Sequence, residues 1–574
     1  MSQVTLTIDG KEVTVEAGTT VLEAARKAAI DIPVLCYHPE LRPEGACRIC
    51  VVEIEGARNL PASCVTPVAP GMVVRTNTPA VREARRTNLE LLLANHPQDC
   101  FTCERNNNCE LQALARDLGI KKVEVKGVRR DLPLDKSGFS LVRDPNKCVL
   151  CGRCVRVCSE VQGVSVLDYA DRGFEAMVYP PLKRPLDQVA CVNCGQCATV
   201  CPVGAITERS DVDRVWEALA DDKNHVVIQV APAVRVSIGE ELGMPPGSIT
   251  TGKLVAALRR LGFHKVFDTD FTADLTIMEE GHELLERLEN GGVLPMFTSC
   301  SPGWIKFIEH YHPDMLAHLS SCKSPQQMFG ALAKTYYASK AGYSARDIFV
   351  VSIMPCTAKK FEAARPEMNS SGVADVDVVL TTRELGKMIR EAGINFAALP
   401  EEAFDEPLGI STGAGVIFGA SGGVAEAALR TIYEVVTGEE LKELDFTAVR
   451  GLKGIKEAAV TLKGRTIRIA VTHGLKNADN LLKKIKAGEA DYDFVEIMCC
   501  PGGCIGGGGQ PIPVDREIRE KRMSAIYAVD RGMELRKSHL NPAVQELYKT
   551  FLEKPLGSKS HELLHTHYQE RSRV

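Results

Sequence analysis

Cysteine is the residue type that most strongly limits the chemistry of this chain. The 574 residues include 21 cysteines: 15 precede residue 202, none lies between residues 202 and 299, and six follow. The first residues lack the basic and then apolar layout of an export signal. We therefore expect a cytoplasmic protein with reduced thiols rather than a disulfide framework. Reduced thiols at this density indicate soft metals, either zinc or iron–sulfur clusters.

Eight of the cysteines form two identical frames. The pattern C-x2-C-x2-C-x3-C occurs at 148–158 and again at 191–201, where Pro202 follows. It is typical of bacterial two-cluster ferredoxins, in which the fourth cysteine of each frame binds the other cluster. The repeat thus predicts two [4Fe–4S] clusters. One set is Cys148, Cys151, Cys154 and Cys201, and the other is Cys158, Cys191, Cys194 and Cys197.

A smaller set includes a histidine. His96 stands four residues before Cys100, and a C-x2-C-x5-C frame continues to Cys103 and Cys109. This frame lacks a fourth thiolate, which a neutral imidazole can replace. The spacing predicts a [4Fe–4S] site with one histidine and three cysteines, and a zinc site of the same composition is the alternative.

The first four cysteines follow a small β-plus-helix unit. Apolar and polar residues alternate over residues 4–15 around Asp9-Gly10, which predicts a hairpin with a type I′ turn. A helix over Val21–Ala29 is expected next, with Thr19 or Thr20 as its N-cap. The cysteines, spaced C-x10-C-x2-C-x13-C, can wrap one cluster, with zinc as the alternative. They are Cys36, Cys47, Cys50 and Cys64.

This unit resembles a plant-type [2Fe–2S] ferredoxin, although its first cysteine gap is longer than in that family's C-x4-C-x2-C spacing. The longer gap is similar to the variant in the large subunits of respiratory complex I and of multi-cluster hydrogenases. The histidine-containing frame resembles the same two families. The resemblance implies that residues 1–209 are an electron relay of four clusters in series.

The remaining residues have the pattern of an α/β protein. Buried strands are expected at 226–231, 348–353, 376–380 and 467–471, and helices at 253–261, 279–289 and 382–391. Three apolar runs end at cysteines, namely Cys300, Cys356 and the pair Cys499 and Cys500. Ligands bind at the carboxyl ends of strands in open α/β sheets, so we expect these thiols to converge on one metal site. Taken singly, each would be read as a small buried hydrophobe.

Glycine is concentrated beside the last cysteines. The segment 501–511 is too rich in glycine for a regular element. We expect it to let the backbone approach something bulky closely, with N–H groups available to anionic ligands, and a flexible loop is the alternative. It is no P-loop, because no Gly-Lys-Ser/Thr follows.

Three segments of this half resemble the three conserved segments of [FeFe]-hydrogenases. They are FTSCSPGW at 297–304, MPCTAKK at 354–360 and EIMCCPGGC at 496–504. With the N-terminal cluster set, the resemblance covers essentially the whole chain. It implies an H-cluster, a [4Fe–4S] cube joined through a cysteine sulfur to a two-iron centre with CO, CN⁻ and azadithiolate ligands. The implied reaction is 2H⁺ + 2e⁻ ⇌ H₂, and the implied load is about 20 iron atoms.

The resemblance also implies residue roles. Cys356, Cys500 and Cys504 match cube ligands, with Cys504 as the bridge to the two-iron centre, and Lys359 matches the partner of a cyanide ligand. Met354, Pro355 and Met498 match residues beside the two-iron centre. The matching proton route consists of Cys300, Glu280, Ser320, Glu283 and Arg287. Glu280, Glu283 and Arg287 share one helical face, which without the resemblance would be read as a solvated charged face.

The chain departs from the family at one position. The family has two adjacent cysteines before Pro-Gly-Trp, whereas here Cys300 is followed by Ser301. A serine oxygen is a poor ligand for an iron–sulfur cube. The fourth ligand is therefore Cys300 in a shifted loop, Ser301 itself, or the extra thiol Cys499, and the sequence leaves these three open.

Composition sets the remaining limits. The net charge of −5 gives no basic field for nucleic acid, and 45% hydrophobic and 25% charged residues are ordinary for a globular protein. The chain contains no run of 18 apolar residues that would indicate a membrane span.

We expect a multidomain α+β and α/β protein: a β-grasp [2Fe–2S] domain, a one-histidine [4Fe–4S] domain, a two-cluster ferredoxin domain and an α/β H-cluster domain. The expected ranges are 1–78, 79–119, 138–209, 210–512 and a wrapping C-terminal segment, 513–574.

The electron partner and two rival functions remain open. The chain has no Rossmann or flavin motif, so electrons are expected to pass to a ferredoxin or to flavin-containing, NAD(P)H-binding subunits of a hetero-oligomer. An electron-transfer or sensory subunit that lacks the two-iron centre is the first alternative. An iron–sulfur assembly protein is the second, and the full N-terminal cysteine array disfavours it. A large subunit of respiratory complex I would share the features of residues 1–209, but it would continue into a molybdopterin-type domain without the strand-end cysteines of this chain.

Overall fold

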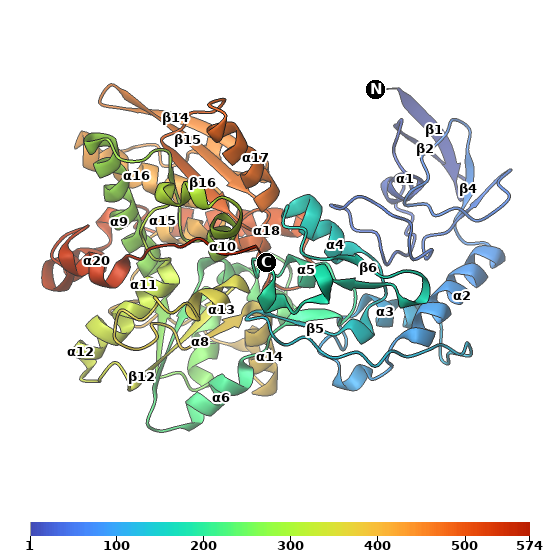
Figure 1. Cartoon of the computed structure of the whole chain (residues 1–574), viewed down its shortest axis with the longest axis horizontal. Helices are drawn as coiled ribbons and strands as arrows, with labels where there is room; N and C mark the ends of the chain where they lie inside the picture. The colour runs from blue at the N-terminus through green and yellow to red at the C-terminus, as the bar shows by residue number, and fades with distance from the viewer. Residues whose placement is uncertain (1, 574) are drawn as a thin grey trace.

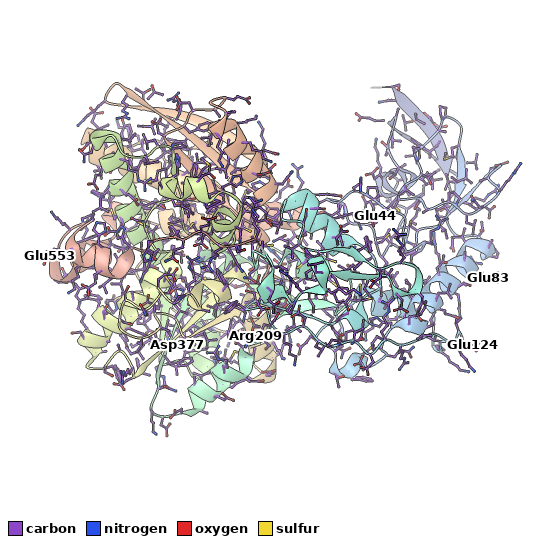
Figure 2. The ribbon with its side chains drawn as sticks, viewed as in Figure 1. Glu44, Glu83, Glu124, Arg209, Asp377 and Glu553 are labelled. Carbon is purple, nitrogen blue, oxygen red and sulfur yellow. The ribbon has the colours of Figure 1, made fainter. Side chains whose placement is uncertain are left out.

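The chain folds into two lobes. The computed structural model describes residues 2–573, except the side chain of Leu462. In Figure 1 the N-terminal third forms the smaller lobe on the right, and the rest forms the larger lobe on the left. Arg209, labelled in Figure 2, stands where the chain passes from one lobe to the other. This is the mixed multidomain architecture that the sequence predicts.

The N-terminal domain is a four-stranded sheet crossed by one helix. Its order is β2-β1-β4-β3, with β1 parallel to β4 and the other pairs antiparallel. The bounds are β1 (Gln3–Ile8), β2 (Lys11–Glu16), α1 (Val21–Lys27), β3 (Glu53–Ile54) and β4 (Val73–Arg75). Asp9 and Gly10 both have positive φ, as a type I′ turn requires. Thr20 caps α1 with a reciprocal bond to Glu23, so the predicted hairpin and cap are confirmed, although α1 ends two residues early.

Short elements carry the remaining N-terminal cysteines. The helices α2 (Pro79–Asn95) and α3 (Glu110–Asp117) flank the histidine-containing frame. The two-cluster unit has pseudo-symmetric parts, in which a one-turn helix begins two residues after the second cysteine of each frame. Its elements are α4 (Arg153–Arg156), α5 (Gln196–Thr199), β5 (Leu141–Arg143), β8 (Ile206–Glu208), β6 (Asp168–Ala170) and β7 (Met177–Tyr179). Strand β5 pairs with β8, and β6 pairs with β7.

The larger lobe contains two four-stranded sheets, seen one above the other in Figure 1. The first has the order β10-β9-β12-β13 and is parallel throughout. The second has the order β11-β16-β15-β14, in which only the edge strand β14 is antiparallel. The bounds are β9 (His225–Val230), β10 (Lys265–Asp268), β11 (Met296–Phe297), β12 (Ile348–Met354), β13 (Val378–Thr381), β14 (Ile455–Leu462), β15 (Arg465–His473) and β16 (Phe494–Met498).

Helices cover these sheets and fill the space between them. The longest, α9 (Thr269–Asn290), packs against α11, α15 and α16, and its first two-thirds are almost wholly buried. The helices of the lobe are α6 (Val212–Ala220), α7 (Ile238–Glu241), α8 (Thr251–Arg260), α10 (Pro302–Tyr311), α11 (Pro325–Leu332), α12 (Ala338–Ala341), α13 (Ala358–Ala363), α14 (Thr382–Glu391), α15 (Gly413–Val416), α16 (Gly423–Thr437), α17 (Leu475–Lys486), α18 (Arg516–Gly532), α19 (Pro542–Leu547) and α20 (Ser558–Leu564).

The C-terminal segment is tied to the larger lobe at several points. From α20 it runs back toward the middle of the molecule (Figure 1). His565 contacts the buried carboxylate of Glu279 at 3.2 Å, and Arg571 contacts that of Glu309 at 2.6 Å. These contacts fix the segment to the larger lobe, and its wrapping role stays a prediction. None of the helices within residues 2–573 is long and apolar enough to cross a membrane.

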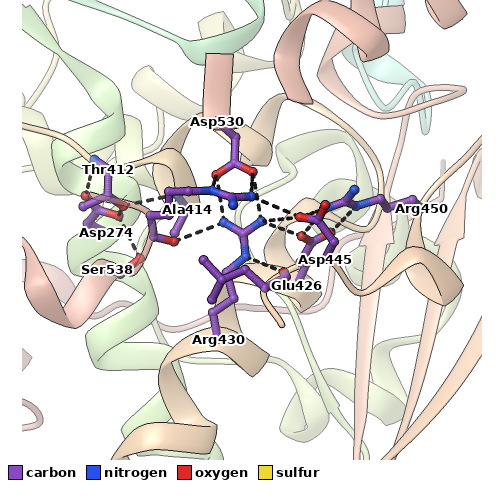
Figure 3. Close-up of polar contacts among 11 residues, drawn as sticks. Asp274, Thr412, Ala414, Glu426, Arg430, Asp445, Arg450, Asp530 and Ser538 are labelled. Atoms are coloured by element: carbon purple, nitrogen blue, oxygen red, sulfur yellow. Dashed lines mark hydrogen bonds and ion pairs between the residues drawn. The ribbon is translucent and has the colours of Figure 1, made fainter. Parts of the chain in front are cut away.

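A buried ion network joins α16 to α18. Arg430, fully buried, donates to both oxygens of Asp530 at 2.8 and 3.0 Å and to Glu426 at 2.6 Å (Figure 3). Arg450 also binds Glu426, and Asp445 lies beside it. Because each buried charge has a partner, the network offsets its desolvation and fixes the two helices to each other.

The two lobes are joined by side-chain hydrogen bonds to backbone carbonyls and by one close backbone approach. The hydroxyl of Thr357 donates to the carbonyl of Asn193 at 2.7 Å, and the Gln196 amide donates to the carbonyl of Gly506 at 2.9 Å. A Cβ atom on Gly508 would collide with the carbonyl oxygen of Cys194. The ferredoxin unit therefore lies directly against the loops that follow β12 and β16.

Candidate functional site

The strand-end cysteines of the larger lobe surround one cavity of about 80 Å³. Cys356 follows β12 of the first sheet, and Cys500 and Cys504 follow β16 of the second. The cavity thus lies between the carboxyl ends of strands from two different sheets. The sequence predicted that strand ends would meet, but not that they belong to two sheets. Other side chains in its wall are Cys300, Ser301, Gln326, Met354, Lys359, Phe418, Met498 and Cys499.

Three thiols of this cavity act on one another. Burial, and then the neighbouring Cys500, raises the pKa of Cys504 to about 12. Burial followed by Cys500 and Cys504 also raises the pKa of Cys356. Buried thiolates in an apolar wall need a compensating positive charge, which a bound metal supplies as it displaces the thiol protons. A wall of thiols and two thioethers therefore fits a soft iron–sulfur group.

The glycine-rich segment forms the side of the cavity nearest the ferredoxin unit. The N–H of Gly509 donates to the carbonyl of Pro355 at 2.9 Å, and the N–H of Gly508 helps to lower the pKa of Cys500. A Cβ on Gly507 would collide with the carbonyl of Pro355. The glycines bring backbone against backbone, and the N–H of Gly508 faces the Cys500 sulfur; their approach to a bulky ligand stays a prediction.

Lys359 lies at the wall of the cavity on the first turns of α13. Its ammonium contacts the carbonyl of Cys300 at 3.2 Å and the carboxylate of Glu362 at 2.9 Å. Gln326 of α11 donates to the same carboxylate at 3.0 Å. Sequence reasoning missed Glu362 and Gln326, although the i,i+3 spacing of Lys359 and Glu362 was a signal for the first of them.

The five residues expected to carry protons form a connected path. The thiol of Cys300 is buried, and after burial the charge of Glu280 is the strongest influence that raises its pKa. The Ser320 hydroxyl donates to Glu283 at 2.7 Å. Glu280 lies beside both residues, because burial, then the charge of Glu283 and then Ser320 act on its pKa. Arg287 donates to Glu283 at 2.7 Å and is partly exposed. The path runs from the cavity to the surface.

Glu280 has the properties of a proton carrier. Burial and then the neighbouring Glu283 raise the pKa of Glu280 to about 8. Its Oε1 belongs to the buried side-chain atoms without a hydrogen-bond partner in the part of the chain that the structure describes. A carboxyl group with its pKa near neutrality can both accept and release a proton under working conditions.

The doubled cysteine frame surrounds two further cavities of about 30 Å³ each. The first is lined by Cys148, Cys151, Cys154 and Cys201. The second is lined by Cys158, Cys191, Cys194 and Cys197. Each cavity thus takes three cysteines from one frame and one from the other, which is the crossed grouping that the spacing predicts. Cys194 lines both the second cavity and the cavity around Cys356, Cys500 and Cys504.

The four cysteines of the N-terminal domain also meet. The thiols of Cys47 and Cys64 hydrogen-bond Cys36, which lowers the pKa of Cys36 to about 2. Cys64 in turn lowers the pKa of Cys50 to about 6. The structure therefore brings all four sulfurs of the predicted set together.

The histidine-containing set lies at a turn between α2 and α3. Burial, and then the nearby Lys147, lowers the pKa of His96 to about 4, so the ring is neutral, as a metal ligand must be. Its Nδ1 has no hydrogen-bond partner within the described residues. The charge of Cys103 acts on Cys109, whereas Cys100 stands in the short turn beside the fully exposed Phe101. The contacts within this set are fewer than in the other three.

Both N-terminal sets border the first ferredoxin cavity. Arg156 donates to the carbonyls of Cys36 and Cys151 at 2.8 and 3.0 Å. Arg105, next to the histidine set, donates to the carbonyl of Cys201 at 3.3 Å. Each N-terminal set thus has its own contact with the first ferredoxin cavity, an arrangement that suits a fork as well as a single series. Sequence spacing carries no information on which sets are neighbours.

No group of three or more His, Cys, Asp and Glu side chains within residues 2–573 is arranged to hold a single metal ion. A zinc site would require such an arrangement. The finding therefore gives no support to zinc as the metal of the Cys36-to-Cys64 set or of the histidine-containing set.

Five family models match successive parts of the chain. The model "Iron only hydrogenase large subunit, C-terminal domain" matches 224–508, and "Iron hydrogenase small subunit" matches 516–571. The model "2Fe-2S iron-sulfur cluster binding domain" matches 1–79, and "4Fe-4S dicluster domain" matches 147–205. Residues 85–124 match "NADH-ubiquinone oxidoreductase-G iron-sulfur binding region".

Two curated relatives align with nearly the whole chain. "NADP-reducing hydrogenase subunit HndD" of Solidesulfovibrio fructosivorans is 52% identical over 100% of both chains. "Iron hydrogenase 1" of Clostridium pasteurianum is 42% identical over 99% of this chain and 100% of its own. Among solved structures, a variant of [FeFe]-hydrogenase HydA1 from Chlamydomonas reinhardtii matches with a TM-score of 0.58 and 48% identity. That match covers 63% of this chain and all of the HydA1 chain.

Proposed function

The chain belongs to the [FeFe]-hydrogenase family, and we propose that it interconverts protons and H₂ as the catalytic subunit of a complex linked to NAD(P). It is an oxidoreductase, an iron hydrogenase with an H-cluster domain and accessory iron–sulfur domains. The observation that carries the proposal is the cavity where Cys356, Cys500 and Cys504 meet beside Lys359 and Cys300.

An H-cluster bound in this cavity would supply the site at which protons are reduced and H₂ is split. Cys356, Cys500 and Cys504 would hold its cube, with Cys504 as the bridge to the two-iron centre. The ammonium of Lys359 would donate to an anionic cyanide ligand. Met354 and Met498, which line the cavity, would pack around the two-iron centre and keep water out. We propose the same neighbourhood for Pro355, whose carbonyl accepts from Gly509.

Proton movement is assigned to the path from Cys300 to Arg287. We propose that Cys300 exchanges a proton with Glu280, which passes it through the Ser320 hydroxyl to Glu283. Arg287 holds the Glu283 carboxylate in place at the surface end. The raised pKa of Glu280 supports its role, because a strongly acidic carboxyl would retain no proton at neutral pH.

Electron supply is assigned to four accessory clusters. We propose one [2Fe–2S] cluster in 1–78, one [4Fe–4S] cluster in 79–119 and two in 138–209. The H-cluster domain is proposed to span residues 210–512, and the C-terminal segment 513–574 is proposed to wrap it. Cys300, Ser301 and Cys499 are the candidates for the fourth ligand of the cube. The contacts of Arg156 and Arg105 support two entry points that meet at the first ferredoxin cluster. The second cluster then delivers electrons to the catalytic cavity, whose wall it shares through Cys194.

The electron partner is proposed to be a separate flavin-containing subunit that binds NAD(P)H. The full-length similarity to a subunit named NADP-reducing supports this choice, as does the match of residues 85–124 to a region of an NADH-linked enzyme. A ferredoxin is the second candidate. The exposed Phe101 beside the histidine set offers an apolar contact surface to a partner of either kind.

Infrared spectroscopy of the maturated protein tests the central proposal. We expect bands in the metal-carbonyl and cyanide stretching region, together with H₂ evolution from a chemical reductant. If maturated protein with its accessory clusters intact lacked these bands, the chain would be an electron-transfer or sensory subunit on the same scaffold.

A further inference from the structure

The position that departs from the family pattern contacts the extra cysteine. Ser301 is the residue before α10, and its hydroxyl oxygen accepts a hydrogen bond from the backbone N–H of Cys499 at 3.2 Å. Ser301 and Cys499 come from different strand ends, β11 and β16, which are neighbours in the second sheet. A hydroxyl at one position and a thiol at the other therefore face the same small region of the cavity wall.

Cys499 lies among the sulfurs of the cube site. Its side chain is only 4% exposed and lines the same cavity as Cys356, Cys500 and Cys504. Its thiol is within hydrogen-bonding reach of the thiols of Cys500 and Cys194. Cys194 belongs to the second ferredoxin set, but Cys499 does not line the cavity of that set. A buried thiol that lies beside Cys500 and lines the cavity of Cys356, Cys500 and Cys504 is placed to bind the iron–sulfur group of that cavity.

Room for this thiol comes from a glycine. A Cβ atom on Gly303 would lie 2.6 Å from Sγ and 3.1 Å from Cβ of Cys499. These distances are too short for any larger residue at position 303, so the first turn of α10 is open where the Cys499 side chain lies. The start of α10, which follows Ser301, thus leaves room for the Cys499 sulfur from the loop after the neighbouring strand β16.

Cys300 lies beside Lys359, whose ammonium contacts the Cys300 carbonyl at 3.2 Å. The groups that act on its thiol are Glu280, Lys359, Cys504 and Glu496. Those that act on Cys356 are Cys500, Cys504 and Lys359. Cys300 is therefore on the side of Lys359 and the proton path, whereas Cys499 is on the side of Cys500 and the ferredoxin unit.

We propose that Cys499, rather than Cys300 or Ser301, provides the fourth thiolate of the H-cluster cube. The inference rests on the proposed function, since it requires a cube between Cys356, Cys500 and Cys504. Cys499 binds as a thiolate and releases its proton on metal binding. Ser301 then serves as a positioning residue whose hydroxyl holds the Cys499 backbone, and Cys300 stays free for proton exchange.

The test is made on the full chain without maturation, so that the cube is measured apart from the two-iron centre. Iron per chain and the Mössbauer spectrum of ⁵⁷Fe-loaded protein are recorded for the wild type, Cys499→Ala and Cys300→Ala. We expect Cys499→Ala to lose the iron of one cube, up to about four atoms per chain. Cys300→Ala should keep the wild-type iron count and spectrum.

A rescue variant separates ligation from folding. Ser301→Cys combined with Cys499→Ala returns a thiol to the same region from the other strand end, and we expect it to restore the lost iron. Full iron in Cys499→Ala would overturn the proposal, as would loss of the cube in Cys300→Ala. A loss in Cys499→Ala that Ser301→Cys does not repair would also overturn it, because it would point to a packing role.

The outcome is independent of the test of the proposed function. If wild-type protein binds the cube but never shows carbonyl and cyanide bands after maturation, the hydrogenase assignment fails while the ligand assignment stands. If the bands are present and Cys499→Ala retains its cube, the ligand assignment fails alone.

Discussion

The hydroxyl of Ser320 donates to the carboxylate of Glu283 across 2.7 Å. Glu280 lies next to this pair on the same face of α9, because burial and then the charge of Glu283 raise its pKa. Two buried carboxyl groups and a hydroxyl from another part of the chain are thereby placed side by side between the cavity and Arg287.

The first prediction concerns the proposed proton path through these residues. Glu283→Gln keeps the size of the side chain but removes its ability to accept a proton, so turnover should fall by about 10²-fold or more. The carbonyl and cyanide bands should be unchanged, because Glu283 does not line the cavity. Hydrogen evolution and infrared spectra are measured on the same sample.

The matched control is Glu286→Gln, one turn along the same helix but exposed to solvent. It should leave both the rate and the bands at wild-type values. A wild-type rate in Glu283→Gln would remove this residue from the path.

The second prediction is a pH dependence of stability. The pKa of Glu280 is raised from 4.5 to about 8 in the folded protein. Between these values the folded state binds a proton that the unfolded state has lost, so this group makes stability fall as pH rises from about 4.5 to about 8. Glu280→Gln should therefore be stabilised relative to wild type, by an amount that grows with pH across this window.

Unfolding midpoints in urea for both proteins, measured at several pH values, give the difference directly. Subtraction cancels the other titrating groups that the two proteins share. A difference that stays constant between pH 5 and about 8 would contradict the raised pKa, and Glu286→Gln should give such a constant difference.

The third prediction concerns the buried ion network of Figure 3. Arg430→Ala leaves the carboxylates of Asp530 and Glu426 without their main buried partner. Removing one member of a buried pair costs about 3–5 kcal/mol, so the unfolding midpoint should fall clearly. Arg531→Ala, at an exposed position of α18, is the control and should change it little. Equal midpoints for the two variants would show that the network does not stabilise the fold.

The fourth prediction concerns the histidine-containing site. His96→Ala should lose the iron of one accessory cluster, about four atoms per chain, because three thiolates remain. The carbonyl and cyanide bands should persist, while electron transfer from the partner complex should slow. His567→Ala, on the exposed tail, should keep all iron. An unchanged iron count in His96→Ala would exclude the ring as a ligand.

Much of this organisation could be predicted from the sequence. The doubled cysteine frame predicted the grouping around the two ferredoxin cavities, because each spacing fits only one crossed arrangement. The helix predicted over 382–391 is observed as α14 with the same ends, since Thr381 and Glu384 form a capping box. Apolar runs likewise located β9, β12, β13 and β15 to within a few residues.

Other features depend on contacts between distant residues. The division of the strands between two sheets cannot be read from apolar runs, which are the same in either sheet. The expected helix over 279–289 is the second half of α9, because polar residues such as Asp270 and Asp274 are buried by tertiary contacts in its first half. The contact of each N-terminal set with the first ferredoxin cavity depends on Arg156 and Arg105, whose partners are far away in sequence.

The glycine contact between the lobes has a consequence for how electrons arrive. Gly508 and Cys194 touch through their backbones, and Thr357 is bonded to Asn193. The last relay and the catalyst thus form one rigid unit, with no hinge between donor and acceptor. Internal delivery of charge should consequently be indifferent to solvent viscosity, and a slower rate in glycerol would trace to encounter with the external reductant alone.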